Sequence, residues 1–159
     1  MNRLTVAALR VLLVILFLGT VITQLWFVPQ FAREAAEWYP MIAYLAAPYA
    51  IVWIAIVANV QVALISIWML LGKVRRGAIF TDSAFLWVNG IIAAGSLATV
   101  LVVGFGIHMI GIVDVGNPPL AMVLGGLILA GVAFTLVMVV MRGLLRQATQ
   151  LQTELEEVV

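Results

Sequence analysis

Four long runs of this chain contain no Asp, Glu, Lys or Arg, and they constrain the fold more than any other feature of the sequence. The runs cover residues 11–32, 38–72, 83–113 and 115–141. A helix needs about 20 mainly apolar residues to cross about 30 Å of hydrocarbon, so each run is long enough for one transmembrane helix. The chain is therefore predicted to be all-α and to cross a membrane four times.

Composition excludes several classes of function. Only 9% of the 159 residues are charged and 65% are hydrophobic, whereas soluble domains carry about 25% charged residues. The chain has no cysteine, which excludes disulfides, thiolate catalysis and cysteine-ligated metals. A formal net charge of +1 excludes a strongly basic face for nucleic acid. We expect no catalytic, cofactor or metal site, and no direct contact with nucleic acid.

The spans use nearly the whole chain, so we expect a single membrane domain over residues 1–159. The predicted architecture is an antiparallel four-helix transmembrane bundle with spans near 8–28, 48–71, 84–106 and 119–141. Between the first two spans, Phe31, Ala35 and Trp38 share one helical face and charged residues share the other. Residues 29–39 are therefore predicted to form a short amphipathic helix along the outer interface. Residues 142–159 would form a cytoplasmic helical extension.

The basic residues predict the orientation, because positively charged loops stay in the cytoplasm. Seven of the eight basic residues lie in the N-terminal tail, the 72–83 loop or the C-terminal tail, and the eighth is Arg33. If these three segments are on one side of the membrane, only Arg33 lies on the other side. We therefore expect a multi-pass protein of the plasma membrane with both termini in the cytoplasm. The lipid bilayer is its most immediate partner.

Uncharged polar residues are predicted in the central part of three spans. They are Thr20, Gln24, Asn59, Gln61, Ser96 and Thr99. Buried amides in hydrocarbon need hydrogen-bond partners, so these side chains should point into the bundle. Asn59 and Gln61 are about 200° apart around a helix and cannot face the same neighbour. The layer is interpreted as packing between helices, with a small polar cavity or pore as the alternative.

His108 is the single ionisable side chain within the apolar runs. Its distance from the start of its span places it near the outer headgroups, where we expect it to bond to backbone, lipid or water. A ligand-binding or pH-sensing role is the alternative, because the reference pKa of histidine is about 6.5. Pairs of small residues, Gly90 with Ala94, Gly95 with Thr99 and Gly126 with Ala130, are expected to pack spans three and four closely, or less plausibly to form a homodimer.

The C-terminal tail carries an apolar stripe with coiled-coil spacing. The stripe consists of Leu144, Ala148, Leu151, Leu155 and Val158. It covers only about two heptads, so a helix of this length needs packing against something else to be stable in water. The cytoplasmic loop of the same chain, a second copy and a partner protein all remain candidates to cover it.

Two cytoplasmic segments resemble a prokaryotic family of short four-span membrane proteins, the domain of unknown function family DUF2975. The resemblance rests on residues 75–81, with the sequence RRGAIFT, and on residues 144–157, with the sequence LLRQATQLQTELEE. Genes of this family commonly lie beside a gene for a small Cro/C1-type helix-turn-helix regulator. The resemblance therefore implies a cytoplasmic transcription regulator as a partner, and it transfers no catalytic residue.

Two hypotheses of function follow. The first is a non-enzymatic interaction or regulatory module that docks a cytoplasmic partner through the 72–83 loop and the tail. Its docking residues would be Arg75, Arg76, Phe80, Leu144, Ala148, Leu151, Leu155 and Val158. The second is a small transport or pore-forming protein, as a single chain or a homo-oligomer, that uses the midplane polar residues. The first is preferred because charged residues along a membrane pathway are missing.

Overall fold

The computed structural model describes residues 3–75 and 82–157, and nearly all of them are helical. The elements are α1 (Arg3–Ile22), η1 (Thr23–Phe27), α2 (Val28–Trp38), η2 (Pro40–Leu45), α3 (Ala46–Arg75), α4 (Asp82–Gly106), η3 (Ile107–Ile112) and α5 (Pro118–Glu157). The segments η1 and η3 are π-helical, and η2 is a 3₁₀ turn. The prediction of an all-α fold is confirmed.

Four stretches of helix are long and apolar enough to cross a membrane. They are Leu4–Trp38, Pro40–Lys73, Ala84–Ile112 and Pro118–Leu151. Each predicted span lies within one of these stretches, so the prediction of four helices able to cross a membrane is confirmed. A helix satisfies its own backbone hydrogen bonds, which is why an apolar chain takes this form in hydrocarbon.

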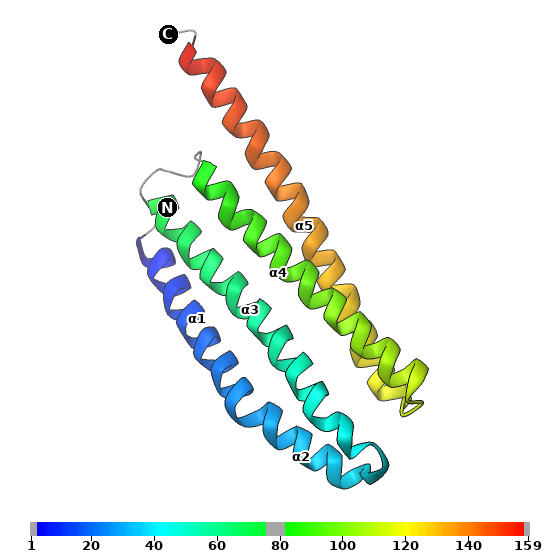
Figure 1. Cartoon of the computed structure of the whole chain (residues 1–159). Coiled ribbons are helices and arrows are strands. Elements are labelled where there is room, and N and C mark those ends of the chain that lie inside the picture. The colour runs from blue at the N-terminus through cyan, green and yellow to red at the C-terminus, as the bar shows by residue number, and fades with distance from the viewer. Residues whose placement is uncertain (1–2, 76–81, 158–159) are drawn as a thin grey trace.

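The first span and the predicted amphipathic helix form one continuous helical path. The π-helical segment η1 joins α1 to α2, and Figure 1 shows the path bending gently there. Pro29 explains the wider turn, because it has no N–H and its ring would clash with a carbonyl four residues earlier. Just before it, the Val28 N–H bonds to the carbonyl of Thr23. The residues expected to form a helix at 29–39 are helical in α2, which continues the first span, and the location of α2 along the outer interface stays a prediction.

The chain reverses at two prolines between α2 and α3. Tyr39 ends α2 with φ −128° and ψ 70°, outside the α-helical region, which is disfavoured for a residue that precedes proline. The 3₁₀ turn η2 then contains a non-helical residue, Ile42. The helix α3 starts at Ala46, and its Pro48 lies in the first turn, where a missing N–H leaves no helical bond unmade.

The long helices pack antiparallel, each mainly on the next one in the sequence. The principal contacts join α1 and α2 with α3, α3 with α4, and α4 with α5 (Figure 1). Both termini lie at the end of the molecule where α3 ends and α4 begins (Figure 1). The expected bundle is therefore open, because α1 and α5 do not pack against each other to close a ring. The helix α5 buries the smallest share of its span.

Two buried clusters hold the row of helices together. One joins Val6 and Leu13 of α1 with Leu71 of α3. The other joins one residue from each of three helices, Ile56, Val102 and Leu124. Since this second cluster includes α3, α4 and the start of α5, it fixes α5 at one end while most of its length contacts α4 alone.

The small-residue pairs pack in three different ways. Gly90 faces α3, where an added Cβ would lie 3.1 Å from the Ser66 hydroxyl oxygen. Gly95 faces α5, where an added Cβ would lie 3.0 Å from the ring of Phe134. Gly126 has open space around it. The expected packing of spans three and four is therefore correct for Gly95, whereas Gly90 packs on span two and Gly126 packs on neither neighbour.

Among the described glycines, Gly131 has the tightest contact between α4 and α5, although it belongs to none of the predicted pairs. A Cβ added there would overlap the Thr99 hydroxyl oxygen and lie 3.2 Å from Thr99 Cβ. We expect Gly131→Leu to lower the free energy of unfolding by about 1 to 3 kcal/mol, because the two helices must separate to admit the side chain. Denaturant unfolding followed by circular dichroism in detergent measures the loss.

Gly126→Leu is the matched control for this prediction. It adds the same side chain to the same helix at a position with open space, so it should leave the unfolding midpoint nearly unchanged. An equal loss of stability in both variants would show that leucine weakens α5 itself, and that the contact between Thr99 and Gly131 contributes little.

Candidate functional site

A cluster of three polar side chains lies between α1 and α3. The side-chain amide of Gln61 donates to the Gln24 carbonyl oxygen at 2.9 Å and approaches the Thr20 hydroxyl at 3.3 Å. Gln24 in turn donates from its own amide to the backbone carbonyl of Ile54 at 3.1 Å. These bonds cross between two helices, so they hold α1 against α3 at the depth predicted for the midplane layer.

Asn59 does not join this cluster. Its side-chain amide donates to the carbonyl of Ala55, one turn earlier in the same helix, at 2.9 Å. The prediction that Asn59 and Gln61 face different neighbours is consistent with these separate partners. The expected layer is therefore divided, since Thr20, Gln24 and Gln61 form one group and Asn59 satisfies its hydrogen bond locally.

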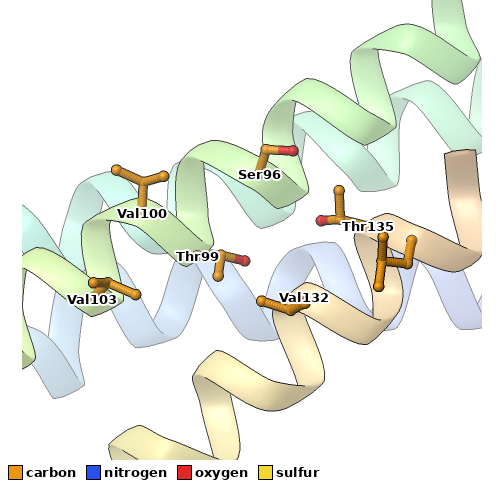
Figure 2. A pocket seen from close by; sticks show the side chains of 7 residues that line it. Ser96, Thr99, Val100, Val103, Val132 and Thr135 are labelled. Carbon is orange, nitrogen blue, oxygen red and sulfur yellow. The ribbon is translucent and has the colours of Figure 1, made fainter.

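The other two predicted members, Ser96 and Thr99, line a cleft between α4 and α5. The cleft has a volume of about 300 Å³ and is also lined by Val100, Val103, Val132, Thr135 and Leu136 (Figure 2). The Thr99 hydroxyl donates to the carbonyl of Gly95 at 2.8 Å. The Thr135 hydroxyl oxygen is buried and has no hydrogen-bond partner within the described part of the chain. Figure 2 shows the hydroxyls of Thr99 and Thr135 on facing sides of the cleft.

Thr135 was not among the predicted polar residues. It lies in an otherwise apolar run, and a single threonine there is usually satisfied by a backbone carbonyl of the previous turn. The sequence signal that could have found it is its depth, because antiparallel packing of α4 and α5 brings Thr135 opposite Gly95.

A second contact with α3 lies nearer the end of the molecule that holds η2. The hydroxyl of Tyr49 and Nδ1 of His108 are hydrogen-bonded at 2.7 Å. The ring of Phe105 meets those of Tyr49 and Trp53 edge to face, with centroids 5.0 and 5.4 Å apart. The expectation that His108 bonds to backbone, lipid or water is therefore wrong about its partner.

The two π-helical segments carry polar side chains that bond to α3. Gln24 lies in η1 and reaches Ile54, while His108 lies in η3 and reaches Tyr49. A π turn widens the helix and reorients the residues that it contains, and such turns are frequent at functional sites. Near one end of the molecule, α3 is thus bonded from both sides, by η1 and by η3.

The apolar stripe of the tail has no cover from this chain where the structure describes it. Leu144, Ala148 and Leu151 are all exposed on α5. Figure 1 shows the last turns of α5 extending beyond the ends of the other helices. Arg76, Phe80 and Val158 lie outside the described residues, as do the side chains of Arg75 and Leu155.

We expect Gln61→Leu to lower the free energy of unfolding by about 1 to 2 kcal/mol, because it removes two contacts between α1 and α3. Asn59→Leu is the matched control, since it removes an amide of the same helix that bonds only within that helix, and its loss should be smaller. Denaturant unfolding in detergent compares the two. Equal losses would show that the bonds to Gln24 and Thr20 add nothing to the association of α1 with α3.

The comparisons with known proteins identify the family of the chain. No curated protein and no solved structure matches it. The family model described as "Protein of unknown function (DUF2975)" matches residues 30–159, which include α3, α4, α5 and most of α2. The family resemblance is confirmed over most of the sequence, and the chain belongs to the DUF2975 family.

Proposed function

We propose that this protein is a non-enzymatic interaction module of the plasma membrane that docks a cytoplasmic protein through its C-terminal helix. The observation that carries the proposal is the exposed stripe of Leu144, Ala148 and Leu151 on the part of α5 that extends past the other helices. Apolar side chains in water associate with a partner, because burial removes their surface from solvent.

The stripe lies beyond the hydrocarbon if α5 crosses the membrane where its apolar run predicts. The 24 residues from Pro118 to Met141 make about 36 Å of helix, enough to cross about 30 Å of hydrocarbon. Arg142 then marks the headgroups, and Leu144 to Leu151 follow in the headgroup region and in water. Lipid tails cannot cover this part of the stripe, so a protein partner is needed.

The basic residues support a cytoplasmic location for this end of the molecule. Lys73, Arg142 and Arg146 belong to the same end, together with Arg3 and Arg10 near the start of the chain. Arg33 lies in α2 near the other end. Since positively charged ends of transmembrane helices stay inside, both termini are proposed to be cytoplasmic, with α2 at the outer interface.

The family resemblance suggests the class of partner. Genes of DUF2975 proteins commonly lie beside a gene for a small helix-turn-helix regulator, so a regulator of this type is the first partner to test. The chain would then hold a transcription regulator at the membrane, and only the regulator would contact DNA. The basic loop at 72–83 would form the rest of the docking surface.

The transport or pore-forming alternative has less support from one copy of the chain. A pore needs polar groups along one path, whereas the midplane residues are divided between the α1–α3 interface and the α4–α5 cleft. The amides of the first group bond to each other or to backbone.

A second copy against α5 could still bring polar groups together, so solute flux into liposomes should be compared between the parent and Gln61→Leu. Flux that is lost while folding is kept would favour a pore.

Single cysteines test the proposed orientation, because the chain has no cysteine of its own. We expect a maleimide that cannot cross membranes to label Glu37→Cys from outside intact cells, and Gln150→Cys only after the membrane is opened. Both positions are exposed, so access depends on the side of the membrane. The opposite labelling pattern would reverse the orientation and exclude cytoplasmic docking.

Charges placed in the stripe test the docking surface. We expect Leu144→Glu with Leu151→Glu to abolish crosslinks from a photoreactive residue at position 148 to the co-expressed neighbouring regulator. Two carboxylates at the centre of an apolar contact have no partner and remain strongly hydrated. Membrane insertion should persist, because residues 118–141 are unchanged.

Gln147→Glu with Gln150→Glu is the matched control for this test. It adds the same charge to the same turns, at exposed positions that are already polar, so crosslinks to the regulator should persist. Crosslinks that survive in both double variants would mean that the stripe is not the docking surface. Crosslinks lost in both would indicate that the added charge, and not loss of the apolar contact, prevents docking.

A further inference from the structure

Arg10 on α1 is a cation that contacts an aromatic ring and has a buried Nε with no hydrogen-bond partner in the described part of the chain. Its guanidinium carbon lies 5.3 Å from the centroid of the Trp68 ring on α3, close enough for a cation–π contact. Its Nε is buried and makes no hydrogen bond within residues 3–75 and 82–157. A guanidinium carries five N–H donors, and the face of an aromatic ring accepts none of them as a full hydrogen bond.

An apolar cleft between α1 and α3 begins at the same tryptophan. The cleft has a volume of about 260 Å³. It is lined by Leu13, Val14, Phe17, Leu18, Leu64, Ile65 and Trp68. On α1, the lining residues follow Arg10 at intervals of three and four positions, so Arg10 and the cleft share one face of the helix. From Arg10 to Leu18 this face extends for about 12 Å along the helix.

The depth of Arg10 matches the boundary between hydrocarbon and headgroups. The first run without acidic or basic residues starts at the next position and continues to residue 32. Arg10 is therefore at the headgroup end of the span, and the cleft leads from it into the hydrocarbon. This arrangement has a cationic head and an apolar tail region, in the same order as the phosphate and acyl chain of a lipid.

We propose that this cleft binds one anionic phospholipid, with its phosphate on the Arg10 guanidinium and an acyl chain along Leu13 to Leu18. Arginine binds phosphate through charge-assisted hydrogen bonds, and a phosphate would use the donors that Trp68 leaves free. The positive charge of Arg10 has no carboxylate against it in the described part of the chain, so the site favours a lipid with net negative charge. Basic pockets between transmembrane helices bind anionic lipids in this way.

This site is separate from the proposed docking surface of α5, and it does not depend on the orientation of the chain. The cleft is formed by α1 and α3, whereas the stripe of the tail is on α5. The lipid would take part in holding α1 on α3 near Val6, Leu13 and Leu71, the buried cluster at the same end. A lipid test can therefore fail while partner docking succeeds, and the reverse is also true.

Native mass spectrometry of the full chain in detergent tests the proposal by counting retained lipids. Phosphatidylglycerol and phosphatidylcholine with the same acyl chains are titrated separately. We expect one phosphatidylglycerol to be retained more tightly than phosphatidylcholine, and Arg10→Gln to weaken its binding by about tenfold, as expected for loss of a charge-assisted bond. Arg10→Lys should restore part of the affinity, because it keeps the charge and loses the planar fork.

Arg142→Gln is the matched control, since it removes the same charge from an exposed position at the headgroup end of α5. It should leave the tight phosphatidylglycerol in place. Equal weakening by Arg10→Gln and Arg142→Gln would overturn the proposal, because it would show a general attraction of basic residues for anionic lipid. Equal retention of both lipids by the parent would overturn it as well.

Two further measurements separate a lipid site from other uses of the cleft. Val14→Trp should fill the apolar part and lower phosphatidylglycerol retention while Arg10 is kept, and unchanged retention would show that no acyl chain lies there. Inorganic phosphate at equal concentration should not displace the lipid, because it gains nothing from the cleft. Displacement would identify a free-anion site and overturn the lipid proposal. Circular dichroism establishes that each variant is folded.

Discussion

A backbone amide or carbonyl inside hydrocarbon has no water to bond with, and this constraint explains the irregular features around Pro29 and Pro40. A proline within a membrane helix removes one donor and pushes against one carbonyl. Near Pro29 the helix responds by widening into η1, and Val28 bonds to Thr23 across the wider turn. The true break comes at Tyr39 and Pro40, where the chain leaves the helix and reverses.

The same constraint explains how the polar side chains are used. Gln24 bonds to the side chain of Gln61 and to the carbonyl of Ile54, both on α3, and Tyr49 bonds to His108 at another depth. These hydrogen bonds determine which faces of the helices meet. Hydrophobicity alone cannot determine this inside a membrane, because lipid tails are as apolar as leucine. The α4–α5 interface relies more on close packing, with Thr99 against Gly131 and Phe134 against Gly95.

The sequence predicts the spans and the locations of most polar side chains well, because both follow from local properties. The run from 83 to 113 must be helical in hydrocarbon, and the approximate depth of Gln61 follows by counting. Partners depend on which helices are neighbours. To predict the pairing of Tyr49 with His108, or the open row of helices, one must know which face of each helix meets its neighbour. The sequence does not indicate this face, because each span is apolar on all sides. Gly131 was missed for the same reason, since its importance comes from Thr99 on the next helix.

The helix α5 is held at one end and long at the other, so it has the geometry of a lever. Leu124 belongs to the buried cluster with Ile56 and Val102, and Gly131 lies against Thr99. Phe134, one turn further on, lies against Gly95, and from there to Leu151 the helix continues for about 26 Å. A change of about 10° in its tilt about that contact would move Leu151 by about 4.5 Å, given this length. A small rearrangement between α4 and α5 would thus produce a much larger displacement at the exposed end of α5.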